Sequence, residues 1–237
     1  DSLEYRLDAS GLRLGAERMP RPATQADLLA SLRRALAEAP RPEAGDAGFP
    51  LHGGLVGVAS YDLVRYFEKL PSHARQDDDS PEAHYIAPRS LLVFDHLTRR
   101  AALLHAGPEH ERQGLRREII RALRGGLPGP AWTASFDAPQ ASLSEEEFLQ
   151  GVARTQEYIA AGDVYQLVLS VRFRGRCDLD PFETYRALRL LNPSPYMYYC
   201  DLGDRVVVGS SPEALVKLNG ARATMRPIAG TRPRGSD

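Results

Sequence analysis

Residues 225 to 235, MRPIAGTRPRG, concentrate groups that can bind an anion. Gly230 permits a close backbone approach, and Thr231 adds a hydroxyl donor. Arg232 and Arg234 follow, and a guanidinium group can pair with a carboxylate through two parallel hydrogen bonds. On residue types alone, this stretch is either an anion-binding turn or an ordinary solvated turn.

Two further polar residues lie next to apolar runs. Gln166 interrupts VYQLVLS, a run rich in residues that favour strands, where its amide either faces solvent or orients a small polar reactant. Glu213 follows Ser-Ser-Pro in GSSPEAL and is either a turn residue or a buried carboxyl group that acts as a general acid. The residue types leave both pairs of alternatives open.

The rest of the chain excludes several common chemistries. The six histidines have no carboxylate or second histidine at metal-ligand spacing, and no GxSxG, Walker A or GxGxxG motif occurs. A net charge of −1 and the lack of a long apolar run predict neither a nucleic-acid partner nor a membrane partner. The two cysteines, Cys177 and Cys200, form no CxxC motif, which is typical of a cytoplasmic protein without a disulfide framework.

The first residues have no basic region followed by an apolar one, so no signal peptide is expected. The chain begins with Asp rather than Met, and we expect it to be an internal piece of a larger protein.

Periodicity and capping residues predict four helices that position these groups. We expect them at 27–39, 109–124, Ser144 to Gly162 and 181–191. In the first, Asp27 is the expected cap, and Leu28, Leu32 and Leu36 share one face. In the third, Ser144 and Glu147 form a capping box and Gly162 is the stop signal.

The predicted strands cover most of the remaining ordered sequence. They comprise a buried strand turning helical over 53–71, two strands over 84–107 joined near Thr98, one over 164–175 that contains Gln166, and runs at 195–202, 205–211 and 213–225. Gly203-Asp204 and Asn219-Gly220 are hairpin signals. These elements predict an α+β fold with much antiparallel pairing rather than regular βαβ winding. A Gly- and Pro-rich linker over 125–141 would divide an N-terminal part, 1–127, from a second part, 142–237.

Five stretches occur in the order and spacing of a known family: GGLVGVASYDLVRYFE, AGDVYQLVLSVRF, PFETYRALRLLNPSPYMYY, VGSSPEALVKL and RPIAGTRPRG. They resemble the chorismate-utilising enzymes, and most closely the anthranilate synthase component I family. The resemblance implies a two-layer α/β sandwich of large, mostly antiparallel sheets with helices outside and the active site between the layers. The first 52 residues carry little of the resemblance and are interpreted as the N-terminal part of the same subunit.

The resemblance also implies a reaction, which converts chorismate and ammonia to anthranilate and pyruvate. Gly230, Thr231 and Arg232 would contact the substrate, with Thr231 also in the catalytic set. Ala229 stands where aminodeoxychorismate synthases usually carry a ring-attacking lysine, which favours direct attack by ammonia. Gln166 occupies the position that resembles the base lysine of isochorismate synthases and would hold ammonia. Glu213 would protonate the departing C4 hydroxyl.

Regulation, cofactor and partners are implied in the same way. NPSPYM resembles half of a tryptophan feedback site, in which Pro195, Tyr196 and Met197 would contact the inhibitor; the alternative is that they are plain core. The Leu-Leu-Glu-Ser segment that completes that site is absent. Mg²⁺ ligands are expected beyond Asp237, so no metal ligand and no activity are expected of this chain alone. A glutamine amidotransferase, separate or fused, would supply ammonia, and an oligomer is expected.

Three other functions remain compatible with the sequence. Aminodeoxychorismate synthase is disfavoured by Ala229, and aminodeoxyisochorismate synthase differs only in stopping before pyruvate is lost. A tryptophan-binding regulatory module without turnover is the non-enzymatic alternative.

Overall fold

The computed structural model describes residues 2–42, 51–72, 80–126, 129 and 135–228 of the chain. The chain divides into two compact units, Asp1–Leu127 with Cys200–Arg205, and Pro128–Tyr199 with Val206–Asp237. The assignment of residues 200–205 to the first unit is a feature that no sequence pattern indicated.

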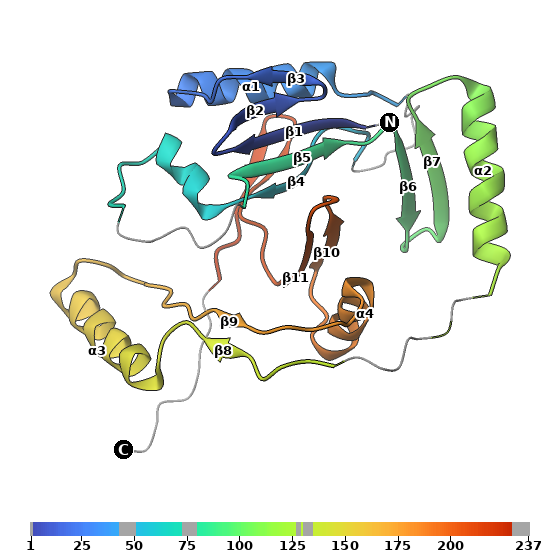
Figure 1. The fold of residues 1–237 in the computed structure, drawn as a ribbon. Helices are drawn as coiled ribbons and strands as arrows, with labels where there is room; N and C mark the ends of the chain where they lie inside the picture. Colours follow the sequence, from blue (N-terminus) through green and yellow to red (C-terminus); the bar gives the residue numbers. More distant parts are fainter. Residues whose placement is uncertain (1, 43–50, 73–79, 127–128, 130–134, 229–237) are drawn as a thin grey trace. The chain divides into compact units, whose positions relative to one another are not determined.

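A five-stranded antiparallel sheet forms the centre of the first unit (Figure 1). Its order is β3-β2-β1-β5-β4, with bounds β1 Leu3–Asp8, β2 Gly11–Leu14, β3 Glu17–Met19, β4 Val56–Ala59 and β5 Ala83–Ala87. The strands β1 to β3 lie in a region for which the sequence analysis assigned no element. β4 lies at an edge of this sheet and Val56 is half-exposed, so the expectation of a buried strand there is wrong.

Strict alternation in β1 and β2 builds the core. Tyr5 and Leu7 are fully buried, and Leu12 and Leu14 nearly so, because successive side chains of a strand point to opposite faces. Helix α1, Gln25–Glu38, packs on this apolar face. Ser31 of the helix shares a hydrogen bond of 2.9 Å with the Tyr5 hydroxyl.

Helix α1 differs from its prediction in two details. Its N-cap is Thr24 rather than Asp27, and Asp27 instead closes a capping box by accepting from the Thr24 backbone. The buried helical positions are Leu28 and Ala35, with Leu32 partly buried, whereas Leu36 is half-exposed. The three leucines recur every four residues, and this spacing drifts from the 3.6-residue period until Leu36 leaves the core face.

The first unit continues with a 3-10 helix, Tyr61–Tyr66, and a hairpin of β6, Ser90–Asp95, and β7, Arg100–His105. The predicted helix over 109–124 is confirmed as α2, Glu109–Arg124, and it contacts β7 (Figure 1). The stretch 84–107 holds parts of three strands rather than two. The additional break falls at Pro88, which has no backbone N–H to continue the ladder of β5.

The second unit contains two helices and several short strand pairs. The predicted helices are confirmed as α3, Glu145–Ala161, and α4, Pro181–Leu191. The strand pairs are β8, Gln140–Ala141, with β9, Phe173–Arg174; β10, Tyr196–Asp201, with β11, Val206–Ser211; and β12, Lys217–Asn219, with β13, Arg222–Thr224. The last two pairs confirm the hairpin signals, with positive φ angles of 87° at Gly203 and 57° at Gly220.

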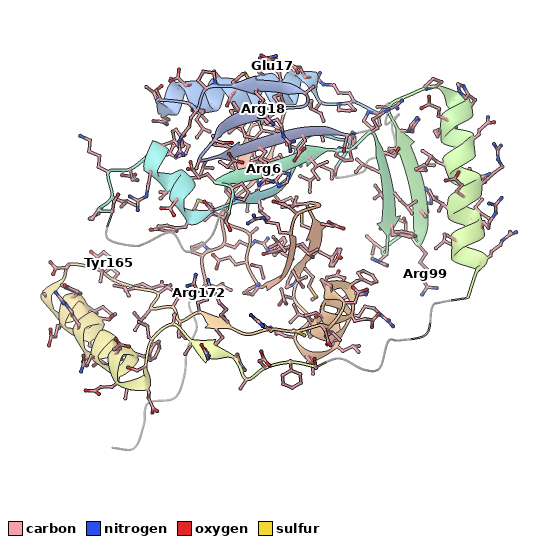
Figure 2. The ribbon with its side chains drawn as sticks, viewed as in Figure 1. Arg6, Glu17, Arg18, Arg99, Tyr165 and Arg172 are labelled. Atoms are coloured by element: carbon pink, nitrogen blue, oxygen red, sulfur yellow. The ribbon has the colours of Figure 1, made fainter. Side chains whose placement is uncertain are left out.

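The prediction of a strand over 164–175 is wrong. Only Phe173–Arg174 are paired, with the two residues of β8, and 164–172 are irregular. Tyr165 is fully exposed and extends into solvent (Figure 2). A strand needs a neighbour to accept and donate its backbone hydrogen bonds, and the described residues offer this run only β8.

The predicted α+β class is confirmed, because helices accompany sheets whose reported strand pairings are all antiparallel. Within the described ranges, no helix combines the length and apolar character needed to cross a bilayer.

Candidate functional site

A cavity of about 600 Å³ lies in the second unit, beside the β12–β13 hairpin. Its lining comes from the beginning of β10, the segment after β11, both strands of the hairpin and the residues that follow it: Pro195, Tyr196, Pro212, Glu213, Ala214, Lys217, Asn219, Arg222, Thr224, Arg226 and Ile228. The volume falls within the ordinary range for small-molecule sites.

Short-range geometry explains why these residues meet. Asn219 pairs with Arg222, and Lys217 pairs with Thr224, so the two strands present alternate residues together. Gly220 supplies the left-handed turn conformation between them. Arg226 continues the same alternation two residues beyond Thr224.

The cavity is electrostatically positive. Lys217, Arg222 and Arg226 contribute three cations, and none makes an ion pair with another described residue. Glu213 is the one carboxylate among the described lining residues, and it is half-buried rather than fully buried. Its backbone is fixed by Ser211, whose hydroxyl donates to the Glu213 carbonyl at 2.9 Å. Such a cavity attracts a small anion and places one carboxyl group beside it.

The structure brings three of the predicted site residues together, namely Glu213, Pro195 and Tyr196. Met197 is adjacent in β10 but does not line the cavity, because neighbouring residues of a strand point to opposite faces. Gln166 is exposed in the irregular stretch after α3 and does not line it either. Ala229, Gly230, Thr231 and Arg232 lie outside the described residues and begin directly after Ile228, the last lining residue.

Sequence analysis missed the three cations of the cavity. Two of them, Arg222 and Arg226, have a signal, because polar residues at every second position (Arg222, Thr224 and Arg226) mark one face of a hairpin strand. Conversely, the same spacing is common on a solvent-facing strand, so the pattern alone does not distinguish a site from a surface.

The described residues do not fit a magnesium site. No group of three His, Cys, Asp or Glu side chains is close enough among them to hold a metal ion. In the cavity one carboxylate stands against three cations, whereas Mg²⁺ prefers oxygen ligands, usually carboxylates, around an octahedral centre. No reaction step is therefore assigned to a metal held by these residues.

The model of the chorismate binding enzyme family matches residues 6–237, and the chain belongs to that family. Within the family it is similar to anthranilate synthase component 1 of Thermus thermophilus, with 47% identity over 191 residues, which are 79% of this chain and 41% of the relative. It is also 41% identical over 241 residues to anthranilate synthase component 1 of Streptomyces coelicolor, covering 94% of this chain and 47% of that one.

A solved structure supports the same fold. Anthranilate synthase component I from Streptococcus pneumoniae matches with a TM-score of 0.75 and 24% identity, covering 93% of this chain and 50% of that one. The chain thus spans about half the length of the relatives it matches.

Proposed function

We propose that this chain is part of the chorismate-binding subunit of an anthranilate synthase, which converts chorismate and ammonia to anthranilate and pyruvate. The names of the relatives support this reading. The observation that carries it in the structure is the cavity in which Glu213 stands among Lys217, Arg222 and Arg226. Chorismate carries two carboxylates, and three unpaired cations favour such a substrate.

The proposed chemistry adds the ammonia nitrogen to ring carbon C2 while the C4 hydroxyl leaves as water. Glu213 donates the proton that this leaving group needs. Ala229 has no amine to compete with ammonia, and Gln166 would hold ammonia through its amide oxygen. Loss of the side chain as pyruvate then yields the aromatic ring. Gly230, Thr231 and Arg232 are proposed substrate contacts.

The finer features belong to the same proposal. Pro195, Tyr196 and Met197 would contact L-tryptophan as a feedback inhibitor. A glutamine amidotransferase would supply ammonia, because a component 1 implies a second component, and the enzyme would be an oligomer in the cytoplasm. A Mg²⁺ requirement is proposed for the complete enzyme, with ligands outside this chain.

Substitution of the proposed acid provides the test. In the complete enzyme, Glu213→Gln is expected to lower kcat with ammonia by roughly 10² to 10⁴, the usual contribution of a general acid, with little change in the KM for chorismate. Glu157→Gln, at an exposed position of α3, is the matched control. The assay is the initial rate of anthranilate fluorescence. Equal kcat values for the two variants would remove Glu213 from the proposed mechanism.

A further inference from the structure

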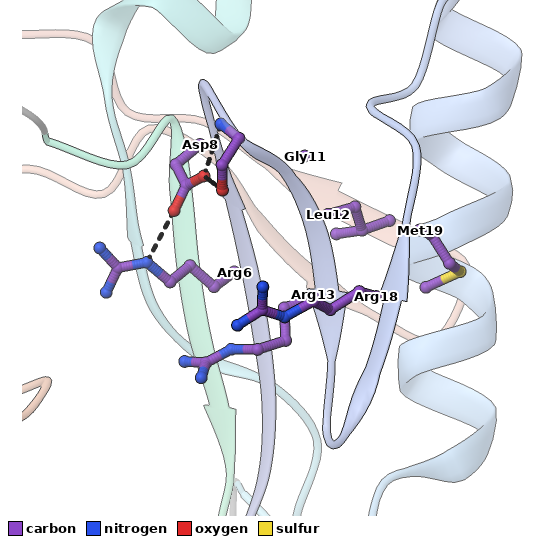
Figure 3. Close-up of a pocket in the computed structure, with 8 residues that line it drawn as sticks. Arg6, Asp8, Gly11, Leu12, Arg13, Arg18 and Met19 are labelled. Atoms are coloured by element: carbon purple, nitrogen blue, oxygen red, sulfur yellow. Dashed lines mark hydrogen bonds and ion pairs between the residues drawn. The ribbon is translucent and has the colours of Figure 1, made fainter.

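Three arginines form a row across the sheet of the first unit. Arg6 of β1 lies directly opposite Arg13 of β2, and Arg13 lies directly opposite Arg18 of β3. Because direct partners across antiparallel strands share a face, the three side chains project to the same side. Figure 3 shows their guanidinium groups on one side of the three strands. This side is opposite the apolar face that α1 covers.

Like charges placed directly opposite one another destabilise a sheet unless they are compensated. Arg6 is compensated by Asp8 at 3.0 Å and by Asp204, of the same unit, at 2.9 Å. Arg13 is compensated by Glu4 at 2.7 Å. Arg18 is exposed and makes no ion pair or hydrogen bond with any other described residue. The row therefore carries an unmatched positive charge at its β3 end.

A cavity of about 340 Å³ lies along this row (Figure 3). It is lined by all three arginines, by Asp8, by Ser10 of the β1–β2 turn and by Gly11, the first residue of β2, among others. The Asp8 carboxylate is already engaged, because the backbone and hydroxyl of Ser10 both donate to it, at 2.9 and 2.5 Å, and Arg6 donates to its other oxygen. The free cation and the partly exposed Arg13 are thus the groups available to a ligand.

We propose that this arginine row is a binding site for a small phosphate-bearing molecule, distinct from the cavity that holds Glu213. Guanidinium groups bind phosphate oxygens through paired hydrogen bonds, and directly opposite residues of adjacent strands have Cβ atoms about 5 Å apart. That spacing suits a ligand with two phosphoryl groups better than a single one. The cavity volume is at the small end of the range for ligand sites.

Pyrophosphate is the probe for this site, measured by isothermal titration calorimetry on the full chain. Wild type is expected to bind it, Arg18→Ala to bind about tenfold more weakly, and Arg18→Lys to fall between them, because lysine keeps the charge but not the planar fork. Arg33→Ala is the matched control, since Arg33 is exposed on α1 and does not line the cavity. Circular dichroism checks that each variant is folded. If Arg18→Ala does not fold, the affinity of Arg18→Lys is compared with that of wild type instead.

Two outcomes overturn the proposal. The first is no pyrophosphate binding by wild type, or the same weakening in Arg33→Ala as in Arg18→Ala. The second is an affinity for citrate, an anion of similar charge, that equals or exceeds the affinity for pyrophosphate. That result would show that the site does not select phosphate. The proposal is supported if pyrophosphate binds more tightly than citrate and Arg18→Ala weakens that binding.

Discussion

Asp8 shows how single side chains of the first unit set its behaviour in acid. Hydrogen bonds from Ser10, and then from Arg6, lower the pKa of the Asp8 carboxyl below its ordinary value. A carboxyl whose pKa is depressed in the folded state stabilises the fold above its unfolded pKa of about 3.9. This contribution is lost as the pH falls through the lower folded value.

Asp8→Asn is therefore expected to lower the thermal midpoint of the chain at about pH 6 and to lose this disadvantage by about pH 2 to 3. The measurement is thermal unfolding by circular dichroism across that range. Asp163→Asn, at an exposed position after α3, is the control and should show no such convergence. A difference between Asp8→Asn and wild type that stays constant down to about pH 2 would contradict the assignment.

At the residue scale, the sequence singled out Glu213 but not the cations that line the same cavity. Glu213 stood out because it follows Ser-Ser-Pro, and the cavity does include it. Lys217 and Arg222 were missed because their meeting depends on the register of β12 against β13, which spacing alone does not fix. The role of Gln166 stays a prediction.

At the element scale, the elements with local end signals were predictable. Helix α3 begins at the Ser144 capping box and ends at Gly162 with a φ of 81°, as its sequence indicated. By contrast, the prediction of a strand over 164–175 was wrong, because a strand is stabilised by its neighbours rather than by its own residues. The short strands β1 to β3 were missed although Tyr5 and Leu7 follow the alternation of a half-buried strand.

The capping box of α1 gives a prediction at this scale. Thr24→Ala is expected to lower the free energy of unfolding by about 1 kcal/mol, because the Asp27 amide loses its acceptor. Thr24→Ser keeps a hydroxyl and should retain most of the stability. Urea unfolding followed by circular dichroism measures both. Equal stability of the two variants would show that the box contributes nothing.

At the scale of the whole molecule, the two units differ in how much apolar surface they bury. The described residues that are buried and apolar all belong to the first unit, including Leu202 of the 200–205 segment. Both units expose large apolar side chains, for example Leu97 at 93% in the first and Leu190 at 86% and Leu215 at 85% in the second, but the second has no buried apolar residue among those described. Exposed apolar surface of this extent marks an interaction surface or an aggregation-prone one.

The 237-residue chain on its own is accordingly expected to bind the apolar dye ANS strongly. Leu190→Ser combined with Leu215→Ser should reduce the dye fluorescence without lowering the thermal midpoint, because neither side chain is buried. Leu7→Ser is the contrasting variant, since Leu7 is fully buried and its loss should lower the midpoint. Unchanged dye fluorescence in the double variant would contradict this interpretation of the second unit.

The central proposal is that the complete protein aminates chorismate and then releases pyruvate. The most direct measurement incubates the complete protein with chorismate, Mg²⁺ and an ammonium salt and follows anthranilate fluorescence and pyruvate together. The account predicts that both products form at equal rates. Consumption of chorismate without release of pyruvate would contradict it, because the reaction would then end at the aminated, non-aromatic intermediate.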